Sequence, residues 1–438
     1  MQNKQLRKWI PFLLFTGLLV GGPTLSGSLA LAADPAPQVA QGANTFAGKI
    51  TGKSNKAKTI TIEVGGKNEF VKFDDKTAGI EHAVEGEASI IQFEIRGNDR
   101  FATSIKPKLV SLPEGIKEIK TDELAKLIAM GPDEGKYVLV DSRPAPRYHE
   151  GHIPTAISIP ETVMKETGAA SLPGDAKLNN TQLIFYCGGP TCGMSPNSAA
   201  MAKKMGYTNL HVMLEGAPGW KKAGKSVVAS EKFVQTGNIV LIDLRSKEEY
   251  EAGHIPKAHN IPMASLAARE DGFPVKAPTV VYANSFVEAQ KGYNMIKKWG
   301  VKTISIWPDG EKSWAAKGNK LATGPTPASI TWVRQMGKGE VGVAEFKKAM
   351  DGNTNQVILD VRTKDEVQGG AFKNSISIPL DEIEKRIGEL PKGKELLVHC
   401  TTGARAEMAK NALDKAGIKS RVLIADVECE QGKCVITD

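Results

Sequence analysis

Five cysteines are the residues of this chain that could act as sulfur nucleophiles or change oxidation state. Cys187 and Cys400 each end a short apolar run, LIFY and LLVH respectively. Cys187 is followed five residues later by Cys192, Cys429 and Cys434 form a second close pair, and Cys400 has no near neighbour. Thiols that are close in sequence tend to pair under oxidising conditions. We therefore expect two local disulfides and take Cys400 as the solitary reactive thiol.

One sequence segment occurs three times. The copies DSRPAPRYHEGHIPTAISIP, DLRSKEEYEAGHIPKAHNIP and DVRTKDEVQGGAFKNSISIP begin at Asp141, Asp243 and Asp360. The residues at the end of the next apolar run follow 46, 40 and 40 positions later, and they are Cys187, Ala283 and Cys400. Repetition at a fixed spacing indicates one supersecondary unit copied three times. The first and third copies can carry thiol chemistry, whereas alanine cannot act as a nucleophile.

The repeats predict strands that alternate with helices. Unbroken apolar runs such as KYVLVDSR and TQLIFYC are typical of strands buried in a parallel sheet, and SAAMAKKMGY has helical spacing. The fold class is therefore α/β, with three tandem doubly wound parallel-sheet domains. Ligands of such sheets bind at the carboxyl ends of the strands, where Cys187 and Cys400 both fall.

A different pattern precedes the repeats. Apolar residues alternate with polar ones between Thr45 and about Val110, in runs at 59–64, 69–73, 88–95 and 100–110. This alternation predicts a small all-β domain, a barrel of OB-like type or a sandwich. It contains no catalytic constellation, so an adaptor role and a plain packing role both remain open.

The predicted organisation is a signal peptide at 1–33, a β domain at 43–112, and αβ units at 116–228 (Cys187), 229–327 (Ala283) and 328–438 (Cys400). Lys4, Arg7 and Lys8 precede a short apolar stretch, and small residues stand near Ala32. We expect export to the periplasm and a soluble mature protein without a membrane span. The alternative is that this segment stays uncleaved as an N-terminal anchor.

The net charge of the chain limits the classes of molecule that it is expected to bind. The net charge is +8, and it falls to +5 without the first 32 residues. This excess is mild and forms no basic stripe, which argues against nucleic acid and favours small anionic substrates. The 438 residues are enough for about three domains.

The segment after Cys400 could stabilise a charge on sulfur. A buried strand ends at Cys400, and a helix is expected to begin near Ala404 to Ala406. Backbone N–H groups of the loop and of the first helical turn have no intrahelical partner, so they can turn toward the sulfur. Together with Arg405 they should favour the thiolate form of Cys400 at neutral pH. Gly403 suits this loop because it has no Cβ.

These motifs resemble those of the rhodanese (thiosulfate sulfurtransferase) family over roughly residues 116–430. The resemblance rests on Asp-x-Arg, on Gly-His-Ile-Pro-x-Ala, on the closing segment GYTNLHVMLEGAPGW at 206–220, and on Cys400-x-x-Gly403-x-Arg405-Ala406 in the third unit. It implies that the cysteine takes sulfane sulfur from a donor such as thiosulfate, holds it as a persulfide and passes it to a nucleophilic acceptor. It also implies that Arg405 helps to hold the anionic donor. The expected substrate-binding residues of this loop are Thr401, Thr402, Gly403, Ala404 and Arg405.

Loop length separates two activities of related folds. Phosphatases with a similar His-Cys loop have five residues between cysteine and arginine, whereas four separate Cys400 from Arg405. The shorter loop fits sulfur better than a tetrahedral phosphoryl group, so we favour sulfur transfer.

The first unit departs from this pattern. The segment CGGPTCGMSPNSA at 187–199 is longer and has no arginine, so a donor there would depend on loop amides, with Gly188 and Gly189 as candidate binding residues. Three interpretations stay open. Cys187 is catalytic and Cys192 resolves its persulfide, or the pair is a redox dithiol, or it is a structural disulfide.

The middle unit serves as an internal control. It keeps Asp243, Arg245 and His254 although Ala283 replaces the thiol, so these residues are expected to serve the fold. His399, beside Cys400, is expected to point to the opposite face of its strand. Cys429 and Cys434 are interpreted as a disulfide staple or, alternatively, as a redox partner of Cys400.

The predicted function is an exported, thiosulfate sulfurtransferase-like enzyme that uses a small anionic sulfur donor and a thiol acceptor. We expect neither a metal nor an organic cofactor, since the tail offers only two thiols. The middle unit or the β domain is a candidate surface for a protein partner. The competing hypotheses are a non-catalytic carrier of sulfur or selenium and a thiol–disulfide oxidoreductase.

Overall fold

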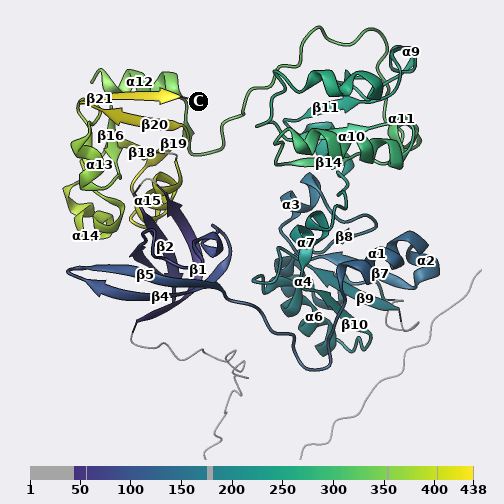
Figure 1. The fold of residues 1–438 in the computed structure, drawn as a ribbon, viewed down its shortest axis with the longest axis horizontal. Helices are drawn as coiled ribbons and strands as arrows, with labels where there is room; N and C mark the ends of the chain where they lie inside the picture. Colours follow the sequence, from purple (N-terminus) through teal and green to yellow (C-terminus); the bar gives the residue numbers. More distant parts are fainter. Residues whose placement is uncertain (1–43, 56, 175–180, 353–354, 402, 438) are drawn as a thin grey trace, which may run out of the picture. The chain divides into compact units, whose positions relative to one another are not determined.

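The computed structural model describes residues 44–55, 57–174, 181–352, 355–401 and 403–437. The expected signal peptide and Thr402 lie outside the described residues. Within these ranges no helix is long and apolar enough to cross a membrane. Figure 1 shows a small β domain and three αβ units, each of which is described by itself below.

The β domain is a closed barrel with the strand order β1-β2-β3-β5-β4. Its core contains Ile50, Ile60, Ile62 and Ile91, which are fully buried, because alternate side chains of each strand point inward. A parallel contact between β3 and β5 closes the barrel, and the other pairs are antiparallel. The elements are β1 (Thr45–Ser54), β2 (Thr59–Val64), β3 (Lys67–Lys72), η1 (Ile80–His82), β4 (Ala88–Arg96) and β5 (Asp99–Pro107).

The first αβ unit has a parallel sheet in the order β6-β10-β9-β7-β8. Separate apolar clusters cover its two faces, which is why β7 and β9 are apolar along their length. The elements are β6 (Lys117–Glu118), α1 (Thr121–Met130), α2 (Pro132–Gly135), β7 (Tyr137–Asp141), α3 (Ala145–Glu150), β8 (Ile157–Ser158), α4 (Glu161–Thr167), η2 (Gly168–Ser171), β9 (Gln182–Tyr186), α6 (Met194–Lys204), β10 (Leu210–Met213) and α7 (Gly216–Lys222).

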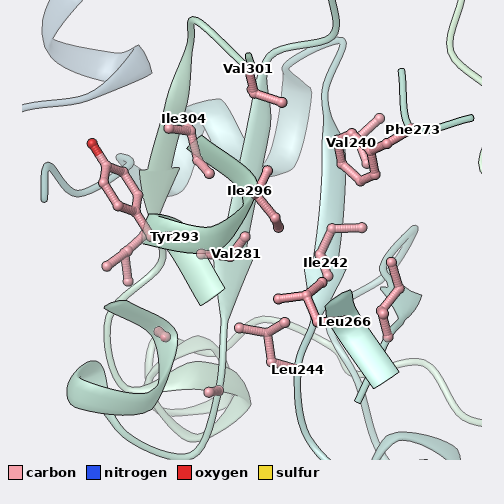
Figure 2. Packing of buried hydrophobic residues seen from close by; sticks show 14 of the residues in the cluster. Val240, Ile242, Leu244, Leu266, Phe273, Val281, Tyr293, Ile296, Val301 and Ile304 are labelled. Carbon is pink, nitrogen blue, oxygen red and sulfur yellow. The ribbon is translucent and has the colours of Figure 1, made fainter. Parts of the chain in front are cut away.

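The middle unit has a parallel sheet in the order β12-β11-β13-β14. Figure 2 shows Val240 and Ile242 of β11, Val281 of β13, and Tyr293 and Ile296 of α10 in its main core. The elements are α8 (Glu231–Thr236), β11 (Val240–Asp243), α9 (Lys247–Ala252), β12 (His259–Asn260), η3 (Met263–Arg269), β13 (Thr279–Tyr282), α10 (Phe286–Lys298), β14 (Ile304–Ile306) and α11 (Gly310–Ala316).

The third unit has a parallel sheet in the order β15-β19-β18-β16-β17, followed by an antiparallel hairpin. The elements are β15 (Glu340–Val341), α12 (Val343–Met350), β16 (Gln356–Asp360), α13 (Lys364–Gln368), β17 (Ile376–Ser377), η4 (Leu380–Glu382), α14 (Ile383–Arg386), η5 (Ile387–Glu389), β18 (Glu395–His399), α15 (Ala404–Lys415), β19 (Ser420–Leu423), β20 (Asp426–Glu430) and β21 (Lys433–Thr437).

The aspartate and arginine of the repeat form a buried ion pair in every unit. The arginine Nη2 lies 2.5, 2.6 and 2.6 Å from the aspartate Oδ2 in the pairs Asp141–Arg143, Asp243–Arg245 and Asp360–Arg362. The same nitrogen donates a hydrogen bond to the carbonyl of Gly151, Gly253 or Gly370. The pair thus ties the end of one strand to the turn after the next helix. This geometry agrees with the prediction that these residues serve the fold.

The histidine of Gly-His-Ile is also engaged in packing. His152 stacks on Tyr148 with ring centroids 3.8 Å apart, and its Nδ1 is hydrogen-bonded to the Tyr148 carbonyl. His254 and Tyr250 repeat the arrangement at 3.7 Å. Burial is the main reason that the pKa of His152 is lowered to about 4, so it is neutral near pH 7.

The third unit has Gly370-Ala371-Phe372 in place of Gly-His-Ile, and its strand β18 ends in a different residue from the first two units. In the first unit the Tyr186 hydroxyl donates a hydrogen bond to Asp141 and accepts one from the Ile153 N–H. His399 takes the place of this tyrosine, and Phe372 takes the place of the isoleucine. The rings of Phe372 and His399 pack edge to face with centroids 4.8 Å apart. The larger phenylalanine thus packs against the smaller imidazole.

The element that follows the last strand of the sheet also differs in the third unit. Helices α7 and α11 follow the last strand of the first two units, whereas β20 and β21 take that place in the third. The Val427 N–H donates to the Thr401 carbonyl at 2.7 Å, and the Gly432 N–H donates to the Gly369 carbonyl at 3.0 Å. The hairpin therefore contacts both the loop after β18 and the end of α13.

Candidate active site

Cys400 lies at the carboxyl end of β18, directly before the loop that leads into α15. It is the free cysteine of the described residues, and it is 1% exposed. The Gly403 N–H donates a hydrogen bond to its Sγ at 3.2 Å. Gly403 has a φ of +96°, and a Cβ at this position would meet the Ile424 side chain at 2.8 Å. A residue without a side chain is thus needed to aim this N–H at the sulfur.

Arg405 is held by a carboxylate. Its Nη1 and Nη2 lie 2.6 and 2.9 Å from the two carboxylate oxygens of Glu366 on α13. Its Nη2 also donates to the Thr401 hydroxyl at 2.9 Å, and this hydroxyl donates to Glu366 at 2.9 Å. The three side chains form one closed cluster beside the Cys400 loop, which we call the Glu366 cluster.

The Glu366 cluster is buried and ionised. The side chains of Glu366 and Arg405 are each 11% exposed. Burial by itself raises the pKa of Glu366, but the hydrogen bonds and charge of Arg405 outweigh this effect and lower the pKa to about 2. The pair therefore carries no net charge at neutral pH. The sequence analysis did not single out Glu366, although the three repeats compared side by side place an ionisable residue at this position.

The side chains of His399 and Cys400 lie on opposite faces of the sheet. Its ring packs against Phe346 and Phe372, whereas Cys400 belongs to the apolar cluster on the other face of the sheet. Burial is the main cause that lowers the pKa of His399 to about 4, against the opposing effect of Asp360. The prediction that this side chain points away from the thiol agrees with its position.

Cys187 lies at the carboxyl end of β9 and is joined to Cys192 by a disulfide. The Ser195 hydroxyl donates a hydrogen bond to the Cys187 Sγ at 3.1 Å, and both residues are 1% exposed. Ser195 is the second residue after the Gly193 N-cap of α6, which is the position that Arg405 has after Gly403 in α15. The sequence analysis missed Ser195, because the longer loop hides this correspondence.

The candidate glycines of the first unit shape this loop. Gly189 has a φ of +124°, and its carbonyl accepts the Cys192 N–H at 3.0 Å. A Cβ at Gly188 would lie within 3.8 Å of the Cys192 side chain. Behind the loop, the Ala217 N–H at the start of α7 donates to the Cys187 carbonyl at 3.0 Å.

The middle unit places Ala283 at the equivalent strand end, where it is 1% exposed and packs in the main core. The next residue, Asn284, donates a hydrogen bond from Nδ2 to Glu249 at 2.8 Å. Arg245 makes a second ion pair, from Nη1 to Glu311 at 3.0 Å. This unit thus keeps the scaffold and fills the reactive position with a methyl group.

Cys429 and Cys434 face each other across β20 and β21 and form a disulfide. Across the described ranges, no group of three or more His, Cys, Asp and Glu side chains could hold a metal ion.

Comparison with known proteins identifies a family. The model of the family described as "Rhodanese-like domain" matches residues 121–223, 229–317 and 342–427, one match in each αβ unit. These matches cover more than half of the chain.

Individual relatives are similar to single units. A provisionally named sulfur carrier protein, YrkF of Bacillus subtilis (strain 168), is 36% identical over 80 residues, which are 18% of this chain and 43% of the relative. A tRNA uridine(34) hydroxylase of Cytophaga hutchinsonii is 40% identical over 81 residues, 17% of this chain and 26% of the relative. The chain thus spans less than half the length of these curated relatives.

Among solved structures, the thiosulfate sulfurtransferase of Pseudomonas aeruginosa is 19% identical, and the match covers 70% of this chain and 66% of that one with a TM-score of 0.21. The three matches of the family model, together with a free cysteine at the end of β18, show that the chain belongs to the rhodanese family, with three rhodanese-like domains in tandem.

Proposed function

We propose that this chain is an enzyme that transfers sulfane sulfur through a persulfide on Cys400. The observation that carries the proposal is the solitary thiol at the end of β18, with the Gly403 N–H directed at its sulfur. A backbone N–H at this distance stabilises negative charge on sulfur, as nucleophilic attack requires. The family supports sulfur transfer in general, while donor and acceptor belong to the proposal.

The reaction has two displacement steps. The Cys400 thiolate attacks the outer sulfur of a donor such as thiosulfate, a new S–S bond forms, and sulfite leaves with the electron pair of the broken bond. An acceptor thiolate then attacks the outer sulfur of the persulfide, and the Cys400 thiolate leaves. No metal or organic cofactor takes part.

Cys187 is the second candidate nucleophile, and it can act only after its disulfide is reduced. In that state the Ser195 hydroxyl would still donate to its sulfur. Attack of Cys192 on a Cys187 persulfide would release hydrosulfide and restore the disulfide. The redox dithiol and the structural disulfide remain the alternatives for this pair.

The cellular setting belongs to the same proposal. The basic residues and the apolar stretch at the start of the sequence support export to the periplasm, where the two local disulfides would persist. The middle unit, which has no thiol, and the β barrel would then serve as surfaces for a protein partner.

A non-catalytic sulfur carrier is the second candidate function, and the provisional name of the relative YrkF favours it. A carrier would hold one sulfur atom and release it only to a protein partner, without turnover of small thiols. A thiol–disulfide oxidoreductase is a third candidate, motivated by the Cys187–Cys192 disulfide.

The test is the intact mass of the protein after incubation with thiosulfate, with the added sulfur located by peptide mapping. We expect one extra sulfur atom on Cys400 in a C187S/C192S protein and none when Cys400→Ser is added. Sulfite release with a dithiol acceptor would distinguish an enzyme from a carrier. Loading without turnover would contradict the enzyme, and insulin reduction that survives Cys400→Ser would support the oxidoreductase.

A further inference from the structure

The three repeats carry different charges at one position near the reactive loop. The sixth residue after the repeat's aspartate is Arg147 in the first unit, Glu249 in the second and Glu366 in the third. Glu249 accepts a hydrogen bond from Asn284, the residue after Ala283, and Glu366 accepts one from Thr401, the residue after Cys400. In the second and third units this side chain therefore contacts the loop that carries the reactive position, and its charge acts on whatever enters there.

We propose that Glu366 determines donor specificity in the third unit: by holding the Arg405 guanidinium in a bidentate ion pair beside Cys400, it favours the persulfide of a thiol over the thiosulfate dianion as sulfur donor. This inference rests on the proposed function, because it names the donor class of the same site.

A dianionic donor requires a cation that is free to bind it. Both terminal nitrogens of Arg405 are already hydrogen-bonded to Glu366, and Nη2 is shared with Thr401. No other cation of the described residues has a hydrogen bond or ion pair to the Glu366 cluster. Thiosulfate would thus approach the Cys400 sulfur beside the Glu366 carboxylate, whose charge offsets that of Arg405. Negative charges that lie close together in a buried site repel each other, and this repulsion opposes binding of the thiosulfate dianion.

Three other basic residues of the third unit do not supply a free positive charge either. Arg362 is paired with Asp360, and Lys364 is paired with Glu382. His399 is neutral near pH 7, because burial lowers its pKa to about 4. The persulfide of a thiol carries less negative charge than thiosulfate, so it is repelled less at this site.

The first unit shows the opposite arrangement. Arg147 stands at the Glu366 position, where its side chain is 68% exposed and paired with Glu150 at 3.3 Å, and Ser195 stands at the Arg405 position. The first unit thus lacks the buried carboxylate–guanidinium pair that stands beside the reactive loop of the third unit. This contrast within one chain indicates that the charge at this position varies independently of the scaffold.

The transfer from a persulfide balances without an added oxidant. The Cys400 thiolate attacks the outer sulfur of R–S–SH and forms a new S–S bond. The donor S–S bond breaks, and RS⁻ leaves with the electron pair. The outer sulfur keeps its proton, so the products are the Cys400 persulfide and a thiolate.

The test uses Glu366→Gln in the full chain with Cys187→Ser and Cys192→Ser, so that only Cys400 loads sulfur. Sulfite release from thiosulfate and thiol release from the persulfide of 2-mercaptoethanol, a thiol without other charged groups, are measured with the same acceptor. Glutamine keeps the size of the side chain but frees the guanidinium. We expect kcat/KM for thiosulfate to rise about tenfold, the size of one charge-assisted hydrogen bond, while kcat/KM for the persulfide changes less than about twofold. The gain with thiosulfate should fall as salt is added.

Two control variants separate charge from shape. Glu249→Gln removes the equivalent charge in the unit without a thiol and should leave both donors unchanged. Thr401→Val removes two hydrogen bonds of the cluster, one to Glu366 and one from Arg405, without changing its charge, and should leave the ratio between the donors unchanged. A parallel loss with both donors in Glu366→Gln, or a donor ratio equal to that of the parent protein, would overturn the inference. If neither donor loads Cys400 in any variant, the proposed function itself fails and the inference with it.

Discussion

Replacement of Asp243 by asparagine should destabilise the middle unit without affecting sulfur transfer. Asp243 is fully buried, and its carboxylate accepts hydrogen bonds from the backbone N–H, Nε and Nη2 of Arg245 at distances between 2.6 and 3.1 Å. The side chain of Arg245 is only 3% exposed. Asparagine would leave this guanidinium without its main counter-ion inside the protein.

The expected loss of unfolding free energy depends on which partners Arg245 keeps in the variant. Breaking a buried ion pair by removing one member costs about 3–5 kcal/mol of unfolding free energy. Arg245 would keep its ion pair with Glu311 at 3.0 Å, so we expect the lower end, about 3 kcal/mol. With a urea dependence of about 1.5 kcal/mol per molar, the unfolding midpoint should fall by roughly 2 M.

Tryptophan fluorescence reports mainly on this unit, because Trp332 also packs against its core and only Trp220 reports on the first unit. Trp299, Trp307 and Trp314 lie in the middle unit, and the third unit, taken as residues 340–437, contains no tryptophan. The matched change Asp360→Asn in the third unit should therefore destabilise the protein without a comparable change in the fluorescence transition. Glu311→Gln should cost about 1 kcal/mol alone, and the double variant with Asp243→Asn should cost more than the sum.

Two results would refute this reasoning. A loss below about 1 kcal/mol would mean that the ion pair does not support the fold. A fall in the rate of Cys400 loading, measured below the unfolding transition, would mean that the middle unit takes part in the chemistry.

Three further predictions concern the third unit. The pKa of Glu366 is lowered to about 2 from its usual value of 4.5, so the ion pair should contribute stability above about pH 4.5 and lose it as the pH falls toward 2; Glu366→Gln should flatten this part of an acid denaturation curve. Gly403→Ala should destabilise the unit by about 1–3 kcal/mol and slow alkylation of Cys400 by iodoacetamide, because the φ of +96° is strained for alanine and the N–H would shift from the sulfur; an unchanged alkylation rate would contradict the role of this hydrogen bond. Replacing both Cys429 and Cys434 by serine should cost about 2 kcal/mol, the value for a short disulfide loop, and the loss should equal that caused by reducing a protein in which Cys187 and Cys192 are already serine.

The fold class could be predicted because burial leaves a direct trace in the sequence. Strands covered on both faces must be apolar throughout, and the three repeats show this pattern at the same spacing, so the parallel sheets were expected. The first barrel strand, β1, was not among the four predicted runs. Its alternation is interrupted by Gly48, where a Cβ would lie 1.9 Å from the Glu63 carbonyl oxygen. Close approach to β2 requires glycine there and hides the strand signal.

The reactive thiol could also be predicted, since Cys400, Gly403 and Arg405 stand within six residues of one another. Glu366 could not be found in the same way, because it comes 34 residues before Cys400 and reaches it only through the parallel pairing of β16 with β18. The family resemblance implied that Arg405 binds the donor, whereas the guanidinium is bound to Glu366. A local motif gives the residue types of a loop, but the charge at the loop depends on neighbours that only the sheet order brings together.

The C-terminal hairpin positions the groups that determine the charge at this loop. In the first unit a helix holds the strand end at the reactive position, through the Ala217 N–H, whereas the third unit uses β20. The short strands β20 and β21 join the core that contains Phe372, through Val427 and the Cys429 side chain. One hairpin therefore contacts the carbonyl of Thr401 on one side and the end of α13, which carries Glu366, on the other. Because the loop that carries Thr401 and the end of the helix that carries Glu366 are both hydrogen-bonded to this hairpin, the change from helix to hairpin and the ion pair at the loop are coupled in the third unit.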